Sequence, residues 1–195
     1  MKNLLVAICL TLIGSHGVHS QVLKDTFNYI SLAEAVELDS SIVFALDLSK
    51  SKLRELPDEL KMFTNLKALK LSKNKLTELP EFFKTFDNLE YLYLNKNKFT
   101  YFPHQVFHLS NLVFLDISRN KITNIPAGIK SLDSLSYLDV WDTRIKTFPE
   151  ELTELKKLQY LDTRGITFSP SFVEKWTKKM PNTVIKFDKP CNCLE

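Results

Sequence analysis

The chain of 195 residues is 44% hydrophobic and 25% charged, as is usual for a folded protein with one buried core, and fits one domain or one repeat array. Its formal net charge of +3 is too small to indicate a polyanion as partner, so any electrostatic role must come from the arrangement of the charges. With four glycines in all, the chain has no glycine-rich loop of the kind that cradles phosphates.

Residues 1–20 have the pattern of a cleaved secretory signal. Lys2 gives a positive start, Leu4 to Ile13 form an apolar run, and Val18 and Ser20 occupy the small-residue positions before Gln21. The apolar run is only about half of the roughly 20 residues that span a bilayer. We therefore expect an exported protein, secreted or periplasmic or held in a cell envelope, with no transmembrane span in its mature chain.

A short amphipathic helix is expected directly after this region. Ser31 and Glu34 have the spacing of a capping box, and the residues from Leu32 to Leu38 supply an apolar stripe. We assign residues 21–42 to a helical N-terminal cap, because the first unit of a stack would otherwise expose an apolar end.

The centre of the chain repeats every 23 residues. The first leucine position recurs at Leu66, Leu89, Leu112, Leu135 and Leu158, and two further apolar columns follow three and five residues later. The last two columns alternate with other residues at period two, which predicts a short strand at the start of each unit. Successive units would then stack their strands in parallel, about 4.8 Å apart.

Each predicted strand is followed by a turn and then by a proline. Asn74, Asn97 and Asn120 occupy the turns, where an inward amide can satisfy backbone groups that the strand no longer pairs. Ser51 and Thr143 take that place in the flanking units and can form fewer such bonds. A proline then ends the extended segment and favours a short helical segment on the outer side.

The pattern LxxLxLxxNxLxxLPxxLxxL, read from Leu66 to Leu89, resembles the leucine-rich repeat family of the 23-residue Leu-Pro type, as in bacterial-like secreted members. The resemblance covers about five units from Val43 to Leu155 and a degenerate sixth. It implies an α/β fold, a right-handed horseshoe-shaped solenoid with a parallel concave sheet and short convex helices. It also implies a non-catalytic role in binding other macromolecules. We assign the repeats to residues 43–168.

The end of the chain is predicted to close the stack. Ser169 and Pro170 can start a helix that runs to about Met180, and the sequence TVIKFD beyond it is typical of a closing strand, so residues 169–195 form a C-terminal cap. Cys191 and Cys193 lie within this region, where a mutual disulfide, an intermolecular bridge and free thiols all remain open.

If the leucines point inward, the residues between them line the concave face. In the later units these residues are aromatic or acidic, which predicts a protein-binding surface for a partner that offers Lys or Arg. Its candidate residues are Tyr91, Tyr93, Phe114, Asp116, Tyr137, Asp139, Trp141, Tyr160 and Asp162. The alternative is that the aromatic rings merely suit strands and pack sideways on one another.

A second surface pattern is basic. Two columns of Lys and Arg fall on the turns beside the strands and predict a cationic rim, from Lys50 to Arg119 in one column and from Lys52 to Arg144 in the other. The alternative function is therefore a binder of carbohydrate or of an anionic cell-envelope polymer, while nucleic acid is not expected. Self-association through the aromatic face is a third alternative, and a solvated edge that discourages aggregation is the structural one.

No catalytic or cofactor site is predicted. His104 and His108 are the only histidines after the predicted signal, and neither has a candidate nucleophile or a metal-ligand pattern beside it. Asp116 and Asp139 would lie side by side on an open sheet, without a pocket that prepares one of them for acid–base catalysis. We therefore expect no enzymatic activity, no cofactor and no metal.

Overall fold

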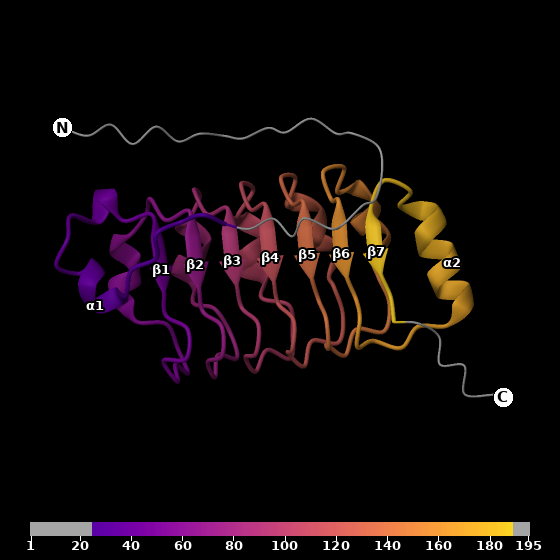
Figure 1. The fold of residues 1–195 in the computed structure, drawn as a ribbon, viewed down its shortest axis with the longest axis horizontal. Coiled ribbons are helices and arrows are strands. Elements are labelled where there is room, and N and C mark those ends of the chain that lie inside the picture. The colour runs from indigo at the N-terminus through magenta and orange to yellow at the C-terminus, as the bar shows by residue number, and fades with distance from the viewer. Residues whose placement is uncertain (1–24, 189–195) are drawn as a thin grey trace.

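The computed structural model describes residues 25–188, which form an open solenoid with one unit of chain per turn (Figure 1). Seven parallel strands follow one another in chain order within a single sheet, and Figure 1 shows them side by side in a row with little curl. The strands are β1 (Ala45–Asp47), β2 (Ala68–Lys70), β3 (Tyr91–Tyr93), β4 (Phe114–Asp116), β5 (Tyr137–Asp139), β6 (Tyr160–Asp162) and β7 (Val184–Lys186).

The register follows the repeat. Each residue of a strand pairs with the residue 23 positions later in the next strand, as Leu69 does with Leu92, and only the last pair has a spacing of 24. Ladder bonds such as Leu71 N–H to Tyr93 O (2.8 Å) connect the units. The middle leucine of the first six strands is fully buried, so its two neighbours project to the opposite side of the sheet. The predicted parallel sheet is confirmed.

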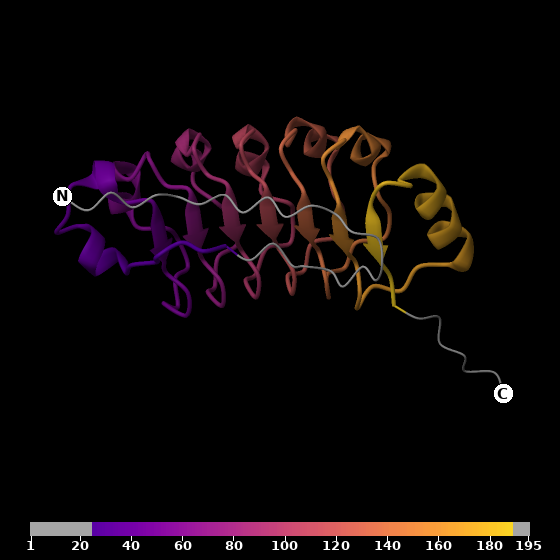
Figure 2. The same ribbon diagram turned by 45° about the horizontal axis from the view of Figure 1, so that its top comes forward.

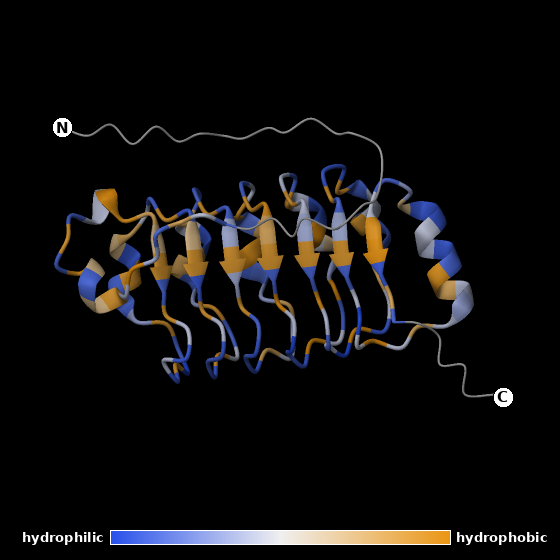
Figure 3. Ribbon diagram, in the orientation of Figure 1, coloured by the Kyte–Doolittle hydropathy of each residue, from blue (hydrophilic) through white to orange (hydrophobic). Residues whose placement is uncertain are grey.

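The core runs through the coil as one continuous cluster. Leucine, isoleucine and phenylalanine from successive units fill it, and Phe63, Phe83 and Phe86 have no exposed surface. Figure 3 shows apolar residues in every strand, and polar residues interspersed with apolar ones in the loops at either end of the strands. A single unit cannot bury its own apolar side chains. They become buried only when neighbouring units stack on either side of it.

The predicted asparagine turns are also present. Each amide oxygen accepts a bond from the backbone of the preceding unit, and each amide nitrogen donates to two carbonyls, or to three in the case of Asn120. Thr143, at the same place in a later unit, makes one bond to Val140 O (2.8 Å). The three asparagines are Asn74, Asn97 and Asn120, and all are buried.

The side of the coil away from the sheet consists of short 3-10 segments (Figure 2). Each begins after a proline and spans five residues, which fits the predicted short helical segments. These segments are Asp58–Met62, Glu81–Thr85, His104–His108, Ala127–Ser131 and Glu150–Glu154.

Both ends of the array carry helical elements. At the N-terminal end, α1 (Leu32–Ala35) has the predicted capping box between Ser31 and Glu34 and is followed by a 3-10 turn, Ser40–Ile42. The helical part is thus shorter than the assigned cap of residues 21–42, and residues 25–30 are extended instead. At the C-terminal end, α2 (Pro170–Lys179) is capped by Ser169, and β7 adds the predicted closing strand.

The predicted signal at residues 1–20, Cys191 and Cys193 lie outside the described residues. Within residues 25–188, no helix has the length and hydrophobicity needed to cross a bilayer.

Candidate interaction surface

The two outward residues of each strand form two columns on the sheet face, which we define as the face that carries the first and third residue of each strand. The first column reads Ala45, Ala68, Tyr91, Phe114, Tyr137, Tyr160 and Val184, and the second reads Asp47, Lys70, Tyr93, Asp116, Asp139, Asp162 and Lys186. Small residues occupy the first strands, and aromatic and acidic residues occupy β3 to β6. All candidate residues except Trp141 therefore lie in two adjacent columns.

The aromatic residues of the first column stack on one another from strand to strand. The ring centroids are 6.0 Å apart for Tyr91 and Phe114, 4.7 Å for Phe114 and Tyr137, and 4.8 Å for Tyr137 and Tyr160. The inner rings are 5% exposed at Phe114 and 8% at Tyr137, while both ends of the stack are half-buried. The rings do pack sideways, as the structural alternative predicted, but outside the main core cluster. Tyr160 is the ring at the open end.

The carboxylates of the second column differ in how they are neutralised. Arg164 donates to both oxygens of Asp162, from Nη2 at 2.6 Å and from Nε at 3.0 Å, and Asp162 is 2% exposed. Asp116 Oδ1 accepts from Ser118 N and Oγ, and Asp139 Oδ1 accepts from Trp141 N. Among residues 25–188, no side chain forms an ion pair with either Asp116 or Asp139.

This lack of a counter-charge shows in the titration of the pair. Burial first, and then the neighbouring charge of Asp116, raise the pKa of Asp139 to about 7. Burial likewise raises the pKa of Asp116, against the bonds from Ser118 that lower it. The two carboxylates are adjacent in register, so ionising both is costly without a cation beside them.

The pH dependence of stability should follow from Asp139. With its pKa raised to about 7, the folded chain keeps a proton that the unfolded chain releases from about pH 4 upward, so the free energy of unfolding falls between these pH values. Asp139→Asn should therefore raise the free energy of unfolding by about 2 kcal/mol at pH 8 and change it little at pH 4. Urea unfolding at both pH values measures this, with the exposed Asp133→Asn as control. An equal effect of D139N at both pH values would contradict the assignment.

Trp141 lies in the turn two residues after Asp139, and Arg119 covers one face of its ring. The guanidinium of Arg119 sits 4.1 Å from the centre of the Trp141 ring, in cation–π geometry, and its Nε is 3.9 Å from Asp142 Oδ2. The sequence placed Arg119 in the basic rim and gave no sign of this contact, since it joins two different units. Trp141 is thereby held in one orientation, half-buried.

An N-terminal strap, residues 25–30, covers the first part of the sheet face. Phe27 packs edge-on against Tyr91 with centroids 5.6 Å apart, and the Tyr93 hydroxyl donates to Asp25. Lys70 Nζ lies 3.4 Å from the ring centre of Tyr29, and Asp47 N–H donates to Ile30 O (2.9 Å). Of the candidate residues, Tyr91 and Tyr93 are thus in contact with the chain's own strap.

Sequence reasoning missed the strap because it included residues 25–30 in the helical cap of residues 21–42 and made no separate prediction for them. One signal was present: Asp25, Phe27 and Tyr29 alternate with Thr26 and Asn28, which is the period of an extended segment. The structure follows that period, because the odd-numbered residues are half-buried and Thr26 and Asn28 are exposed.

The predicted basic rim is present at the turns. Four residues of the rim have a left-handed backbone conformation, with φ between 52° and 61°: Lys50, Lys73, Lys96 and Arg119. This conformation is unfavourable for most residues other than Gly and Asn. The pKa of Lys96 is lowered, first by the charge of Arg119 and also by that of Lys73. The rim is thus a row of like charges close enough to repel one another.

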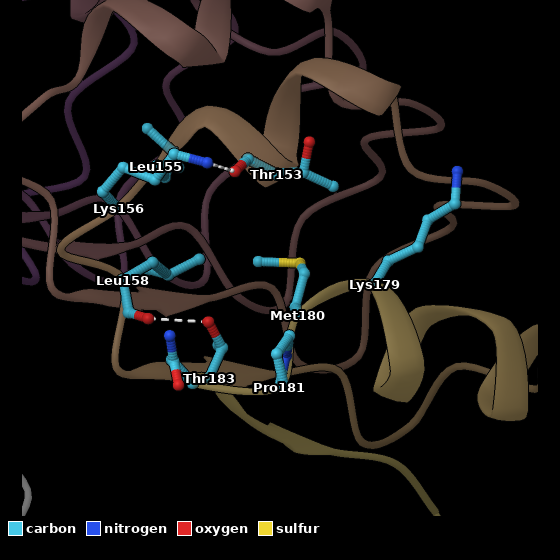
Figure 4. A pocket seen from close by; sticks show the side chains of 9 residues that line it. Thr153, Leu155, Lys156, Leu158, Lys179, Met180, Pro181 and Thr183 are labelled. Carbon is cyan, nitrogen blue, oxygen red and sulfur yellow. Dashed lines mark hydrogen bonds between the residues drawn. The ribbon is translucent and has the colours of Figure 1, made fainter.

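Two further local features, a pair of histidines and a hollow beside α2, are accounted for by the packing of the fold. His104 and His108 are exposed, and His104 Nε2 lies 3.3 Å from Glu81 Oε1. A hollow beside α2 is lined by Leu155, Leu158, Met180 and their neighbours (Figure 4), and Thr183 Oγ1 closes it with a bond of 2.7 Å to Leu158 O. It lies where the C-terminal cap meets the last 3-10 segment.

A row of parallel strands, of which the first five are each followed by a turn and a 3-10 segment, defines a solenoid repeat protein whose surface is formed by residues from successive units. A leucine-rich repeat model matches residues 45–99, 64–122 and 87–145. The chain belongs to the leucine-rich repeat family. Members of this family are protein-interaction modules and typically non-catalytic scaffolds, so the resemblance seen in the sequence is confirmed.

A solved structure shows the same fold. Internalin C2 of Listeria monocytogenes superposes with a TM-score of 0.62 at 20% identity, over 76% of this chain and 62% of internalin C2. The chain therefore spans less than two thirds of that protein. A leucine-rich repeat protein of Leptospira interrogans gives a TM-score of 0.37 at 25% identity, over 73% of this chain and 54% of the other. A search of curated protein sequences found no match.

Proposed function

We propose that this protein is an exported, non-catalytic module that binds a partner protein through the part of the sheet face formed by β4, β5 and β6. The observation that carries the proposal is the coexistence on one face of a rigid aromatic stack and of two carboxylates without a counter-charge among the described residues. Pre-stacked rings lose little conformational freedom on binding, and unpaired carboxylates gain from a cationic partner. Export is supported by the sequence of residues 1–20.

The strap divides the nine candidate residues into two groups. Tyr91 and Tyr93 contact residues 25–30, whereas the strap makes no aromatic contact or hydrogen bond with the surface from Phe114 to Asp162. Phe114 and Tyr137 are nearly buried within the stack and contribute to its rigidity. Tyr160 and Trp141 are half-buried, so they keep surface for a partner, as hot-spot residues do.

The test is capture of the native partner with the purified protein as bait, compared among three variants. Tyr160→Ala and Trp141→Ala should each weaken binding of the captured partner by about tenfold or more, since aromatic hot spots contribute about 2 kcal/mol. Tyr101→Ala is the matched control, because Tyr101 is 76% exposed and lies outside the sheet face. Thermal unfolding of each variant verifies that it is folded. Full binding by both Y160A and W141A would refute the proposed face.

A second candidate function, binding of a glycan or anionic envelope polymer, is favoured by the basic rim. The charges of Lys50, Lys73, Lys96 and Arg119 are alike, the pKa of Lys96 is lowered by those of its neighbours, and a bound polyanion would relieve this repulsion. A glycan array separates the two functions: saturable binding that falls steeply with added salt supports the rim. Its absence, together with partner capture that depends on Tyr160, supports the sheet face.

A further inference from the structure

The N-terminal strap shows how the sheet face holds an extended chain. Asp25, Phe27 and Tyr29 point to the sheet while Thr26 and Asn28 are exposed, so alternate side chains make the contacts. These contacts are an edge-on aromatic pair with Tyr91, a bond from Tyr93 and a cation over the Tyr29 ring. The strap thus packs Phe27 against Tyr91, the first ring of the aromatic stack. Its other contacts with the sheet face are polar or charged and lie beside that ring.

The same platform continues past the strap. Tyr91, the ring that Phe27 contacts, stacks on Phe114, and the stack goes on through Tyr137 to Tyr160. Strand spacing is unchanged along it, since the register is regular from β1 to β6. The surface over β4, β5 and β6 is therefore a continuation of an interface that the structure already shows to accept an extended segment.

The charges of this continuation differ from those under the strap. Under the strap, the second column provides Asp47 and Lys70, which have opposite charges, and the Lys70 amine lies on the Tyr29 ring. Over β4 and β5 it provides Asp116 and Asp139, each with one oxygen bonded to the backbone of its own turn and the other oxygen without a hydrogen-bond donor among residues 25–188. Over β6, Asp162 already has Arg164 as its cation. One position on the surface therefore lacks a counter-charge.

We propose that the partner presents an extended basic segment, which lies across β4, β5 and β6 in line with the strap and seats one Lys or Arg side chain between Asp116 and Asp139. The proposal rests on the proposed function and specifies its partner. Adjacent parallel strands separate the two carboxylates by about 4.8 Å, so a single ammonium or guanidinium group reaches both. The aliphatic stem of that side chain would lie along the ring edges of Phe114 and Tyr137.

The test uses a display library of random linear peptides, selected against the purified protein at pH 8, above the pKa of about 7 of Asp139. Selected peptides should be enriched in Lys or Arg with an aromatic or aliphatic residue two positions away, in keeping with the alternate contacts of the strap. Binding should weaken by at least about tenfold in the double variant D116N/D139N, because a buried charge pair is lost. Asp133→Asn, an exposed aspartate away from the sheet face, should leave binding unchanged.

Other occupants of the surface give different results. Peptides without basic residues, or binding that D116N/D139N leaves intact, would overturn the proposal. So would peptide binding that occurs only after the residues before Asp25 are removed, because the chain itself would then be the occupant, and so would dimerisation that D116N/D139N abolishes. If the peptides fail while capture of a native partner still depends on Tyr160, the extended basic segment is refuted and the proposed function stands.

Discussion

Asn97→Ala should lower the free energy of unfolding by about 2–4 kcal/mol, a large part of the stability of an ordinary domain. The Asn97 amide donates to Leu71 O and Leu94 O, both at 2.9 Å, and accepts from Leu76 N–H at 3.1 Å. Alanine removes all three bonds and leaves Leu76 N–H without a partner in a buried turn, whereas the two carbonyls keep one bond each, from Asn74 and Asn120. An orphaned buried group costs about 1–3 kcal/mol and each of the other lost bonds about 0.5–1.5 kcal/mol, and water that enters the gap recovers part of the loss.

Urea unfolding, with the midpoint and slope compared with those of the parent chain, measures this loss. The control is Asn88→Ala, because Asn88 is exposed and makes one bond, from Nδ2 to Thr64 O at 3.2 Å. The control should change stability by less than about 1 kcal/mol. Equal effects of N97A and N88A would show that the buried asparagines do not connect the units.

Much of the fold was predictable from the sequence because the same spacing of apolar residues recurs in every repeat. The alternation of Leu69 and Leu71, repeated as Leu92 and Leu94, sets both the strand and its inward face, and the 23-residue spacing sets the register. Local rules were enough at the ends as well, since Ser31 and Ser169 each cap a helix by accepting a bond from the backbone three residues later, at Glu34 and Phe172. Periodic and short-range signals are the ones that a single sequence reveals.

The candidate surface was predictable in its membership but not in its environment. The columns place Phe114, Tyr137 and Tyr160 side by side, whereas the sequence does not reveal that Arg164 neutralises Asp162 and that nothing described neutralises Asp139. The contact of Asp25 with Tyr93 joins residues 68 positions apart. Such contacts depend on side-chain orientation and on a segment outside the repeat, so the 23-residue periodicity does not predict them.

Trp176→Ala should destabilise the C-terminal cap by about 3–5 kcal/mol, because it empties a fully packed site. Trp176 is 1% exposed and lies edge-on to Phe148, with ring centroids 5.1 Å apart, and 6.1 Å from Phe172. Hydrogen exchange should show lost protection in β7 and β6, such as at Val184 and Thr163, whose amides pair with Gln159 O and Lys186 O. Lys178→Ala, an exposed residue of the same helix, is the control.

The pattern of that loss distinguishes a stack of units from a single cooperative core. In a solenoid each unit contacts only its neighbours, so β2 and β3 should keep their protection when the last units open. Since β6 carries Tyr160 and Asp162, opening the cap would also disorder the end of the proposed surface while leaving Asp116 and Lys70 in place. Uniform loss of protection along all seven strands in W176A would contradict this, because it would mean that the array unfolds as one unit.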